Sequence, residues 1–339
     1  MNLNTTRNTM SNTTTTTHSP RTSGRATLAS ALLLLGITDG VFLAGCGPTF
    51  DPASLIETTR VLGARVEVDG DPARATPRPG ETASVTWLIT SPEATPPLHW
   101  AFAVCAPGSV GGTTSLSCQS APLALFEGTN TTPRISISVP PLESLGGASS
   151  LLLYGELCAG GDSMPMFDPQ SGIPGCTQGG GTTMSVSVPL QLGDDANHNP
   201  TADRAFTFEG EVWPTLASGD DPCLAGPWAS AGSTDHVIGN MTEASDRESY
   251  TGMAGDPPVA TPKRESLQIS QFTTAGKLKS QFSFVEATDE NTETTVEVKW
   301  EAPKEEDVPA AGLAVTFTFV TRDNRGGTDW TTRAVCVRR

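Results

Sequence analysis

Short stretches of alternating or β-branched apolar residues, separated by clusters of proline and glycine, recur along the chain from Arg60 to its end. The 339 residues include 34 glycines and 27 prolines, which favour turns and end regular elements. No window combines the period and the end signals of a long amphipathic helix. The pattern therefore predicts an all-β protein built from antiparallel β-sandwiches. The expected strands are 60–68, 83–89, 98–105, 133–139, 150–158 and 183–192, followed by 204–213, 266–274, 277–287, 294–303, 313–323 and 329–337.

The length suits about two domains of ordinary size. Residues 194–203 are polar and lack apolar periodicity, so we predict that they link a first β-sandwich domain over 58–193 to a second over 204–339. Residues 214–265 hold few strand signals, which predicts a long loop. Because loops on a rigid scaffold commonly bind ligands, this loop is the first place to look for recognition.

The N-terminus has the pattern of an export signal. Residues 1–25 contain three arginines and no acidic residue, and a short apolar run with small residues follows them. The run ends in Leu43, Ala44, Gly45 and Cys46, which resemble the lipobox of bacterial lipoproteins. The resemblance implies that residues 1–45 are a cleaved signal peptide, that Cys46 carries lipid, and that 46–57 are a tether.

Two other interpretations of this segment are a transmembrane anchor and a free cysteine beside an ordinary cleavage site. The apolar run is shorter than the ~20 residues that a membrane span needs, and it contains Asp39, which is costly inside a bilayer. Gly47 follows Cys46, where enterobacterial lipoproteins retained in the inner membrane have aspartate. By that analogy we expect a lipid anchor in the outer membrane, facing either the periplasm or the cell surface.

The cysteines agree with export to an oxidising compartment. Without Cys46, six cysteines remain, an even number that allows 15 connectivities. A zinc site would need closely spaced Cys or His pairs, which the sequence lacks. Spacing favours the disulfides Cys105–Cys118, Cys158–Cys176 and Cys223–Cys336.

The charge balance limits the partners. The net charge of −16 leaves no basic stripe that could neutralise phosphates, so nucleic acid is not an expected partner. An anionic lipid surface is an equally poor partner for the protein's own charge. Contact with the membrane is therefore expected through the lipid alone.

The sequence shows no set of residues typical of a catalytic site. The sequence contains no GxSxG nucleophile motif and no HExxH metal motif. His99, His198 and His236 stand without the neighbours that a nucleophile–base pair requires. We therefore predict that the protein is not an enzyme. A hydrolase acting on envelope polymers, the least favoured alternative, would need a carboxylate pair in a cleft.

The predicted linker carries one candidate metal site. Its stretch from Asp195 to Pro200 resembles the calcium-binding interdomain linker of cadherins, although His198 stands where that motif has an acid. Calcium prefers six to eight oxygen ligands. The alternative is a solvated, turn-forming linker, and no other cofactor is expected. The candidate ligands are Asp194, Asp195, Asn197, Asn199 and Asp203.

The C-terminal segment resembles the last strands of bacterial immunoglobulin-like domains. A strand that ends in Trp-x-Ala-Pro and a later turn that begins with Asp and contains Gly carry the resemblance. Together with the lipobox, the arrangement is similar to functionally uncharacterised cell-envelope lipoproteins abundant in myxobacteria. It implies two immunoglobulin-like antiparallel β-sandwich domains. The matching residues are Trp300, Ala302, Pro303, Asp323, Gly326 and Gly327.

These features favour a lipid-anchored cell-envelope protein with a non-catalytic binding or adhesion role toward a protein or glycan ligand. The alternative is a structural spacer or scaffold subunit of an envelope complex. A binding role predicts that one region is needed to capture a partner, whereas a spacer tolerates changes in its loops.

Overall fold

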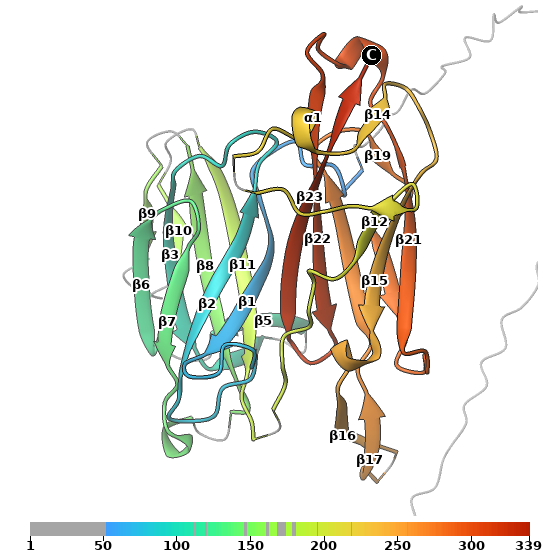
Figure 1. Ribbon diagram of the computed structural model, residues 1–339. Coiled ribbons are helices and arrows are strands. Elements are labelled where there is room, and N and C mark those ends of the chain that lie inside the picture. The colour runs from blue at the N-terminus through green and yellow to red at the C-terminus, as the bar shows by residue number, and fades with distance from the viewer. Residues whose placement is uncertain are drawn as a thin grey trace, which may run out of the picture. The chain divides into compact units, whose positions relative to one another are not determined.

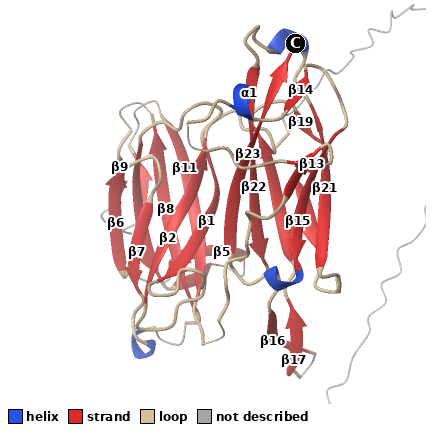
Figure 2. Ribbon diagram, in the orientation of Figure 1, coloured by secondary structure: helices blue, strands red, loops and turns tan. Residues whose placement is uncertain are grey.

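The computed structural model describes residues 52–339 apart from 111–112, 119–120, 146–147, 161–162, 168–173, 178–180, 195, 218 and 256, without the side chains of 108–120 and 174. Residues 50–339 form one compact unit. Its regular structure is nearly all strand (Figure 2), and its one α-helix in the described part, α1 (Pro222–Ala225), is a single turn. The all-β prediction is therefore confirmed. None of the helices described here is long and apolar enough to cross a membrane.

The first half forms two facing sheets, which we call the N-terminal sheet pair (Figure 1). One sheet has the order β1-β2-β7 and the other the order β11-β8-β3-β6. The core between them includes Trp87, whose ring stacks on Phe102 with centroids 4.1 Å apart. The strands are β1 (Arg60–Val68), β2 (Thr82–Thr90), β3 (Leu98–Cys105), β6 (Ala124–Thr129), β7 (Arg134–Ser138), β8 (Ser150–Ala159) and β11 (Thr182–Gln191).

Burial along the strands explains why the sequence forms these sheets. In β7, Ile135 and Ile137 are buried while their neighbours are exposed, as expected for a strand with one covered face. Almost every residue of β3 is buried, because two hairpins pack on the outer face of its sheet. These hairpins are β4–β5 (Pro107–Val110 and Thr113–Cys118) and β9–β10 (Pro165–Phe167 and Pro174–Cys176).

The second half forms the C-terminal sheet pair, with the orders β13-β12-β15-β21-β19 and β14-β23-β22-β18-β20. Its core is rich in aromatic rings, among them Trp213, Trp300 and Phe317. The pair β14–β23 is parallel. The strands are β12 (Phe206–Phe208), β13 (Glu211–Val212), β14 (Trp228–Ser230), β15 (His236–Glu243), β18 (Leu267–Thr273), β19 (Lys277–Leu278), β20 (Phe282–Val285), β21 (Glu293–Glu301), β22 (Leu313–Asp323) and β23 (Thr328–Arg338).

The prediction of a long loop over 214–265 is wrong. This stretch holds α1, β14 and β15, and it ends in the hairpin β16–β17 (Ser249–Ala254 and Val259–Arg264). β15 escaped prediction because Gly239 and polar buried residues interrupt its pattern. A Cβ at Gly239 would lie 2.5 Å from Thr207 Oγ1, so a larger residue would force the Thr207 side chain of β12 to move.

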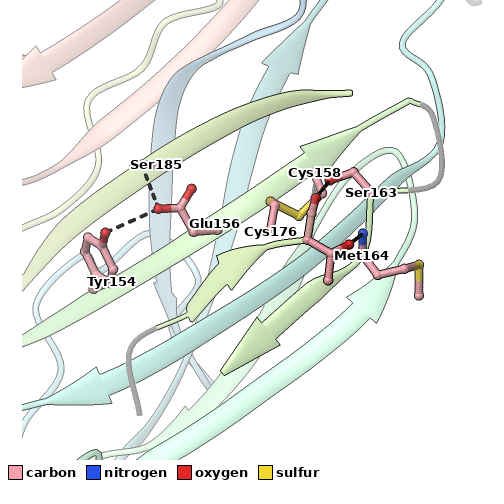
Figure 3. The surroundings of a disulfide bond; sticks show 8 residues. Tyr154, Glu156, Cys158, Ser163, Met164, Cys176 and Ser185 are labelled. Atoms are coloured by element: carbon pink, nitrogen blue, oxygen red, sulfur yellow. Dashed lines mark hydrogen bonds between the residues drawn. A yellow bond between two sulfur atoms is a disulfide. The ribbon is translucent and has the colours of Figure 1, made fainter. Parts of the chain in front are cut away.

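Two of the three predicted disulfides are present among the described residues. Cys158–Cys176 ties the β9–β10 hairpin to β8 (Figure 3), and Cys223–Cys336 ties the α1 turn to β23. Cys105 is also disulfide-bonded, while the side chain of its predicted partner Cys118 lies outside the described residues.

A small third core joins the two sheet pairs. Ile56, at the end of the predicted tether, is 1% exposed and packs there, and its N–H donates to Thr273 O at 2.8 Å. An ion pair between Arg65 of β1 and Asp329 of β23 adds to the joint. The other members of this core are Leu62, Phe272 and Val320, with Leu88 and Trp330 at its margin.

Candidate binding groove beside strand β11

Two adjoining cavities run along the C-terminal half of β11. Their volumes are about 400 Å³ and about 550 Å³, and Pro189 and Gly326 line both. β11 and the residues that follow it form one side of both cavities. The other lining residues come from β1, from the facing ends of β22 and β23 with the turn between them, and from Thr76 and Trp87. We call the two cavities together the β11 groove.

β11 presents an open strand edge to this groove. Its partner on the other side is β8, and Leu192 N donates to Ser149 O at 2.9 Å in continuation of that ladder. The even-numbered residues of β11 therefore bond to β8, and the odd-numbered ones direct their N–H and C=O groups away from it. Pro189 occupies an odd position, where its missing N–H costs no ladder bond. No strand of the described chain pairs with this edge.

The facing edge of β1 is partly closed by contrast. The carbonyl of Leu62 accepts a hydrogen bond from Arg322 Nη2, and that of Val66 accepts one from Asn199 Nδ2 at 2.7 Å. Val68 N donates to Arg74 O at 3.2 Å. Side chains and a loop thus engage several backbone groups on this edge of β1, whereas no hydrogen bond among the described residues engages the outward backbone groups of β11.

The lining of the first cavity is almost uncharged. β11 itself has no charged residue, although edge strands are commonly protected by one. Val186 and Val188 are half-buried and turn toward the N-terminal core, while Ser185 and Ser187 are exposed. The cavity therefore offers apolar contacts beside a row of backbone hydrogen-bonding groups.

Trp87 and Arg322 bring an indole N–H and a guanidinium to the lining of the first cavity. Trp87 is fully buried, and its Nε1 has no hydrogen-bond partner among the described residues. Arg322 is the one charged residue of this lining, and it donates to Ser270 Oγ at 2.9 Å. Burial lowers the pKa of its guanidinium, and no carboxylate of the described chain pairs with it. The cavity thus contains an unneutralised cation in an acidic protein.

Ser185 is held at the outer face of its sheet (Figure 3). Its Oγ donates to Glu156 Oε1 at 2.7 Å, and the hydroxyl of Tyr154 donates to the same oxygen at 3.2 Å. Burial, with the charge of Glu156, raises the pKa of the Tyr154 hydroxyl. Since its hydroxyl is engaged, Ser185 offers the groove chiefly its backbone.

The second cavity is charged. Asp323 and Arg325 line it, and Arg325 Nη1 lies 3.1 Å from Glu265 Oε1. Glu265 is only 1% exposed, so burial raises its pKa to about 7; the nearby charges of Asp323 and Glu248 add to the rise, and Arg325 opposes it. Burial also raises the pKa of Asp323, against the hydrogen bonds that it accepts.

Two of the candidate calcium ligands brace the linker instead of converging on one point. Asn197 Nδ2 donates to Asp323 Oδ2 at 3.2 Å. Asn199 donates to β1 and accepts from Thr328 N at 2.9 Å through its Oδ1. Both amides therefore fasten the segment 194–203 to strands of the two sheet pairs.

The remaining candidate ligands lie apart. Asp203 Oδ1 accepts from Arg333 Nη2 at 2.6 Å, which lowers the pKa of Asp203. Asp194 is exposed and lies 3.4 Å from Arg78, and Asp195 lies outside the described residues. Among the residues that the structure does describe, no group of three or more His, Cys, Asp or Glu side chains is placed to hold a metal. Calcium binding stays a prediction, which melting curves with calcium and with chelator would test.

Comparisons with known proteins assign no family to this chain. No protein-family model matches the chain. A search of curated proteins found no significant match either. The resemblance to bacterial immunoglobulin-like lipoproteins therefore stays a prediction.

Sequence reasoning missed the groove. It predicted β11 as a strand but could not assign it to an edge, and it singled out neither Trp87 nor Arg322. The available signal was the uncharged composition of 182–191, which is unusual for an edge strand. The lipobox residues and Cys46 lie outside the described residues.

Proposed function

We propose that this protein is a lipid-anchored, non-catalytic binding protein of the cell envelope, and that the β11 groove is its ligand site. The observation that carries this proposal is the open edge of β11 beside two cavities of about 400 and 550 Å³. Ligand sites are usually concave, mostly apolar and furnished with a few polar groups, as the first cavity is.

We also propose that each sheet pair is an immunoglobulin-like domain. In the N-terminal pair the first, second and fifth long strands share one sheet, and the third, sixth and seventh share the other. That distribution agrees with the constant-type immunoglobulin order, except that the fourth strand, β6, pairs with β3 in the second sheet instead of joining the first. In the C-terminal pair, β12, β15 and β21 face β18, β22 and β23 in the same way. Strand order supports the assignment independently of the C-terminal motif.

The anchor is proposed from the lipobox. After removal of residues 1–45, a lipid on Cys46 would hold the protein to the outer membrane. The variant Cys46→Ala should move from the membrane fraction to the soluble fraction of the envelope. Protease treatment of intact cells then separates a surface location, where the protein is degraded, from a periplasmic one, where it is protected. A variant that stays membrane-bound would contradict the lipid anchor.

Site-specific crosslinking tests the binding role. A photo-crosslinking amino acid in place of the exposed Ser187 should give a discrete adduct in cells that make the protein naturally. The same amino acid in place of Glu297, an exposed residue of β21, is the control. Adducts absent from the Ser187 position, or identical at both positions, would contradict a ligand site in the groove.

A structural spacer is the second candidate, favoured by the joint between the sheet pairs. Ile56, Leu62 and the Arg65–Asp329 ion pair lock β1 to the C-terminal pair. A spacer requires this joint and not the groove. The two variants can be compared in cells that depend on the protein. If Asp329→Ala fails to support those cells while a groove variant such as Ser187→Pro supports them fully, the spacer is favoured.

A further inference from the structure

The C-terminal sheet pair shows what can cover such an edge. There the order β14-β23-β22-β18 places the short strand β14 on the outer edge of β23 (Figure 1). In the N-terminal pair β11, β8 and β3 follow one another as β23, β22 and β18 do, but no described strand stands in the place of β14. The two pairs therefore differ at one equivalent edge.

The geometry of β14 shows how an extended segment uses that position. β14 runs parallel to β23, with Trp228 opposite Cys336 and Ala229 opposite Val337. The side chain of Ala229 is 2% exposed and belongs to the core, while Trp228 and Ser230 are exposed on either side of it. Backbone bonds bracket the strand, since Cys336 N donates to Pro227 O and Ala231 N donates to Arg338 O.

At the equivalent place the N-terminal pair has the cavity of about 400 Å³. Val186 and Val188 line it from β11, Val61 and Ala64 line it from β1, and Trp87 lines it from the core. An inward side chain such as that of Ala229 has no counterpart there among the described residues. The cavity can therefore accept one apolar side chain from a segment lying on the edge of β11.

We propose that an extended polypeptide segment of a partner protein binds along β11, parallel to it, in the position that β14 occupies in the C-terminal sheet pair. This inference rests on the proposed function, because it names the ligand class of the same groove. The segment would hydrogen-bond to the outward backbone groups of Ser185, Ser187 and Gln191, which is strand addition. Its inward residue is apolar and fills the first cavity.

Charge gives the segment a second requirement. Arg322 is the one charged residue that lines this cavity, and it has no carboxylate partner in the described chain. A guanidinium pairs best with a carboxylate through charge-assisted hydrogen bonds. We therefore expect an acidic residue beside the apolar one in the bound segment.

A glycan fits the groove less well than a polypeptide. Trp87, the aromatic residue of the lining, is fully buried and stacks on Phe102, so it presents no open ring face for a sugar. The edge of β11 instead repeats backbone donors and acceptors with the spacing of a strand. That repeat is complementary to another polypeptide backbone.

The test uses a phage-displayed library of random dodecapeptides selected on the full-length protein in detergent. Selection on the wild type should enrich sequences with an apolar residue next to an acidic one. The variant Ser187→Pro, which removes an outward N–H, should enrich none of them, whereas Ser187→Thr, which keeps it, should enrich the same set. Melting curves of both variants check that the fold is retained.

Chemical analogues of the best peptide then test the binding mode. Methylation of the alternate backbone nitrogens that face β11 should weaken binding about tenfold or more, since it removes two or more hydrogen bonds. Methylation of the other set should have little effect. Bound peptide should also slow hydrogen exchange at the amides of Ser185, Ser187 and Gln191. In Arg322→Gln the preference for an acidic over a basic peptide should disappear.

Opposite outcomes overturn the inference. Equal binding of the two methylated analogues, or enrichment of the same peptides on Ser187→Pro, excludes strand addition on β11. If no peptide is enriched but the crosslinker at position 187 captures a glycan or a lipid, the inference fails and the proposed function stands. If neither peptide enrichment nor a position-dependent crosslink is seen, both fail.

Discussion

The outer edges of β23 and β11 occupy the same place in two sheets with the same succession of strands, yet only one of them is paired. β14 covers β23, and the Cys223–Cys336 disulfide fastens the chain just before β14 to the same strand. β11 has no such cover among the described residues and is bordered by cavities. Because both sheet pairs share this strand order, the order alone does not decide whether the edge is paired. The unpaired edge is specific to the N-terminal sheet pair.

The edges of β11 and β1, on the two sides of the groove, also differ in how they are protected. Unpaired edges invite unwanted pairing, and proteins commonly protect them with charges, prolines or bulges. β11 has one such device, Pro189, and no charge, whereas Arg322 and Asn199 bond to carbonyl groups on the facing edge of β1. The proposed strand addition therefore depends on the outward groups of β11 other than Pro189.

The largest expected effect comes from loosening the covered edge. The double variant Cys223→Ala/Cys336→Ala opens a loop with a sequence separation of 113 and should lower the free energy of unfolding by about 5 kcal/mol. The pair Cys158→Ala/Cys176→Ala, with a separation of 18, should cost about 3 kcal/mol. Denaturant unfolding measures both. A larger loss from the second pair would contradict the loop-entropy argument.

Proline substitution separates the bonded side of β11 from the open side. Val188 bonds to β8, so Val188→Pro should cost about 3 kcal/mol or more, because it removes a ladder hydrogen bond and introduces a clash. Ser187→Pro, one residue away, should cost less than about 1 kcal/mol because its N–H has no strand partner. Equal losses in thermal unfolding would mean that the edge of β11 is not open.

The charges of the second cavity can be tested through Glu265, which pairs with Arg325 of its lining. Its pKa is raised to about 7 from an ordinary value of 4.5, so the folded state favours its protonated form. The contribution of Glu265 to stability is therefore greatest below about pH 4.5 and is lost as the pH rises through about 7. Glu265→Gln should reduce the decline in stability between about pH 5 and pH 8, by about 2 kcal/mol.

The measurement is denaturant unfolding of both proteins at the two pH values. The exposed Glu297→Gln serves as the control, and it should leave the pH dependence unchanged. A variant at Glu265 with the full wild-type decline would show that this carboxyl does not titrate in the folded protein near neutral pH.

The smallest effect is expected at the partly closed edge of β1. Asn199→Ala removes the hydrogen bonds to the carbonyl of Val66 and from the N–H of Thr328, and should cost about 1 kcal/mol. It should also speed hydrogen exchange at β1 while leaving β11 unchanged. Faster exchange at β11 instead would mean that the two edges are not protected independently.

Much of the fold could be predicted where burial follows the strand period. Runs such as 134–138 and 293–301 alternate clearly because one face of each strand is covered. β15 could not be predicted, because Gly239 packs closely against Thr207 and the strand buries Asn240 and Thr242. Glycine and asparagine are unfavourable in a strand by propensity, and a buried threonine breaks the apolar pattern, so only their contacts explain them.

The candidate site was less predictable than the fold. The disulfides Cys158–Cys176 and Cys223–Cys336 agree with spacing, since short staples and one long closure were the simplest arrangement. Asn197 and Asn199 were expected to bind calcium, but their amides hydrogen-bond to groups more than a hundred residues away along the chain. A sequence lists oxygen donors without showing which protein groups already engage them.

By itself the sequence determined that the chain is all-β and where most of its long strands lie, because side-chain alternation and turn residues act over a few neighbouring positions. Which strands lie at edges, and which of those edges are covered, depended on the tertiary structure. The contacts that close β1 come from Arg322, at the far end of the chain, and β14 reaches β23 from more than a hundred residues away. An open edge is the absence of such distant contacts, and the uncharged composition of 182–191 cannot establish it without them.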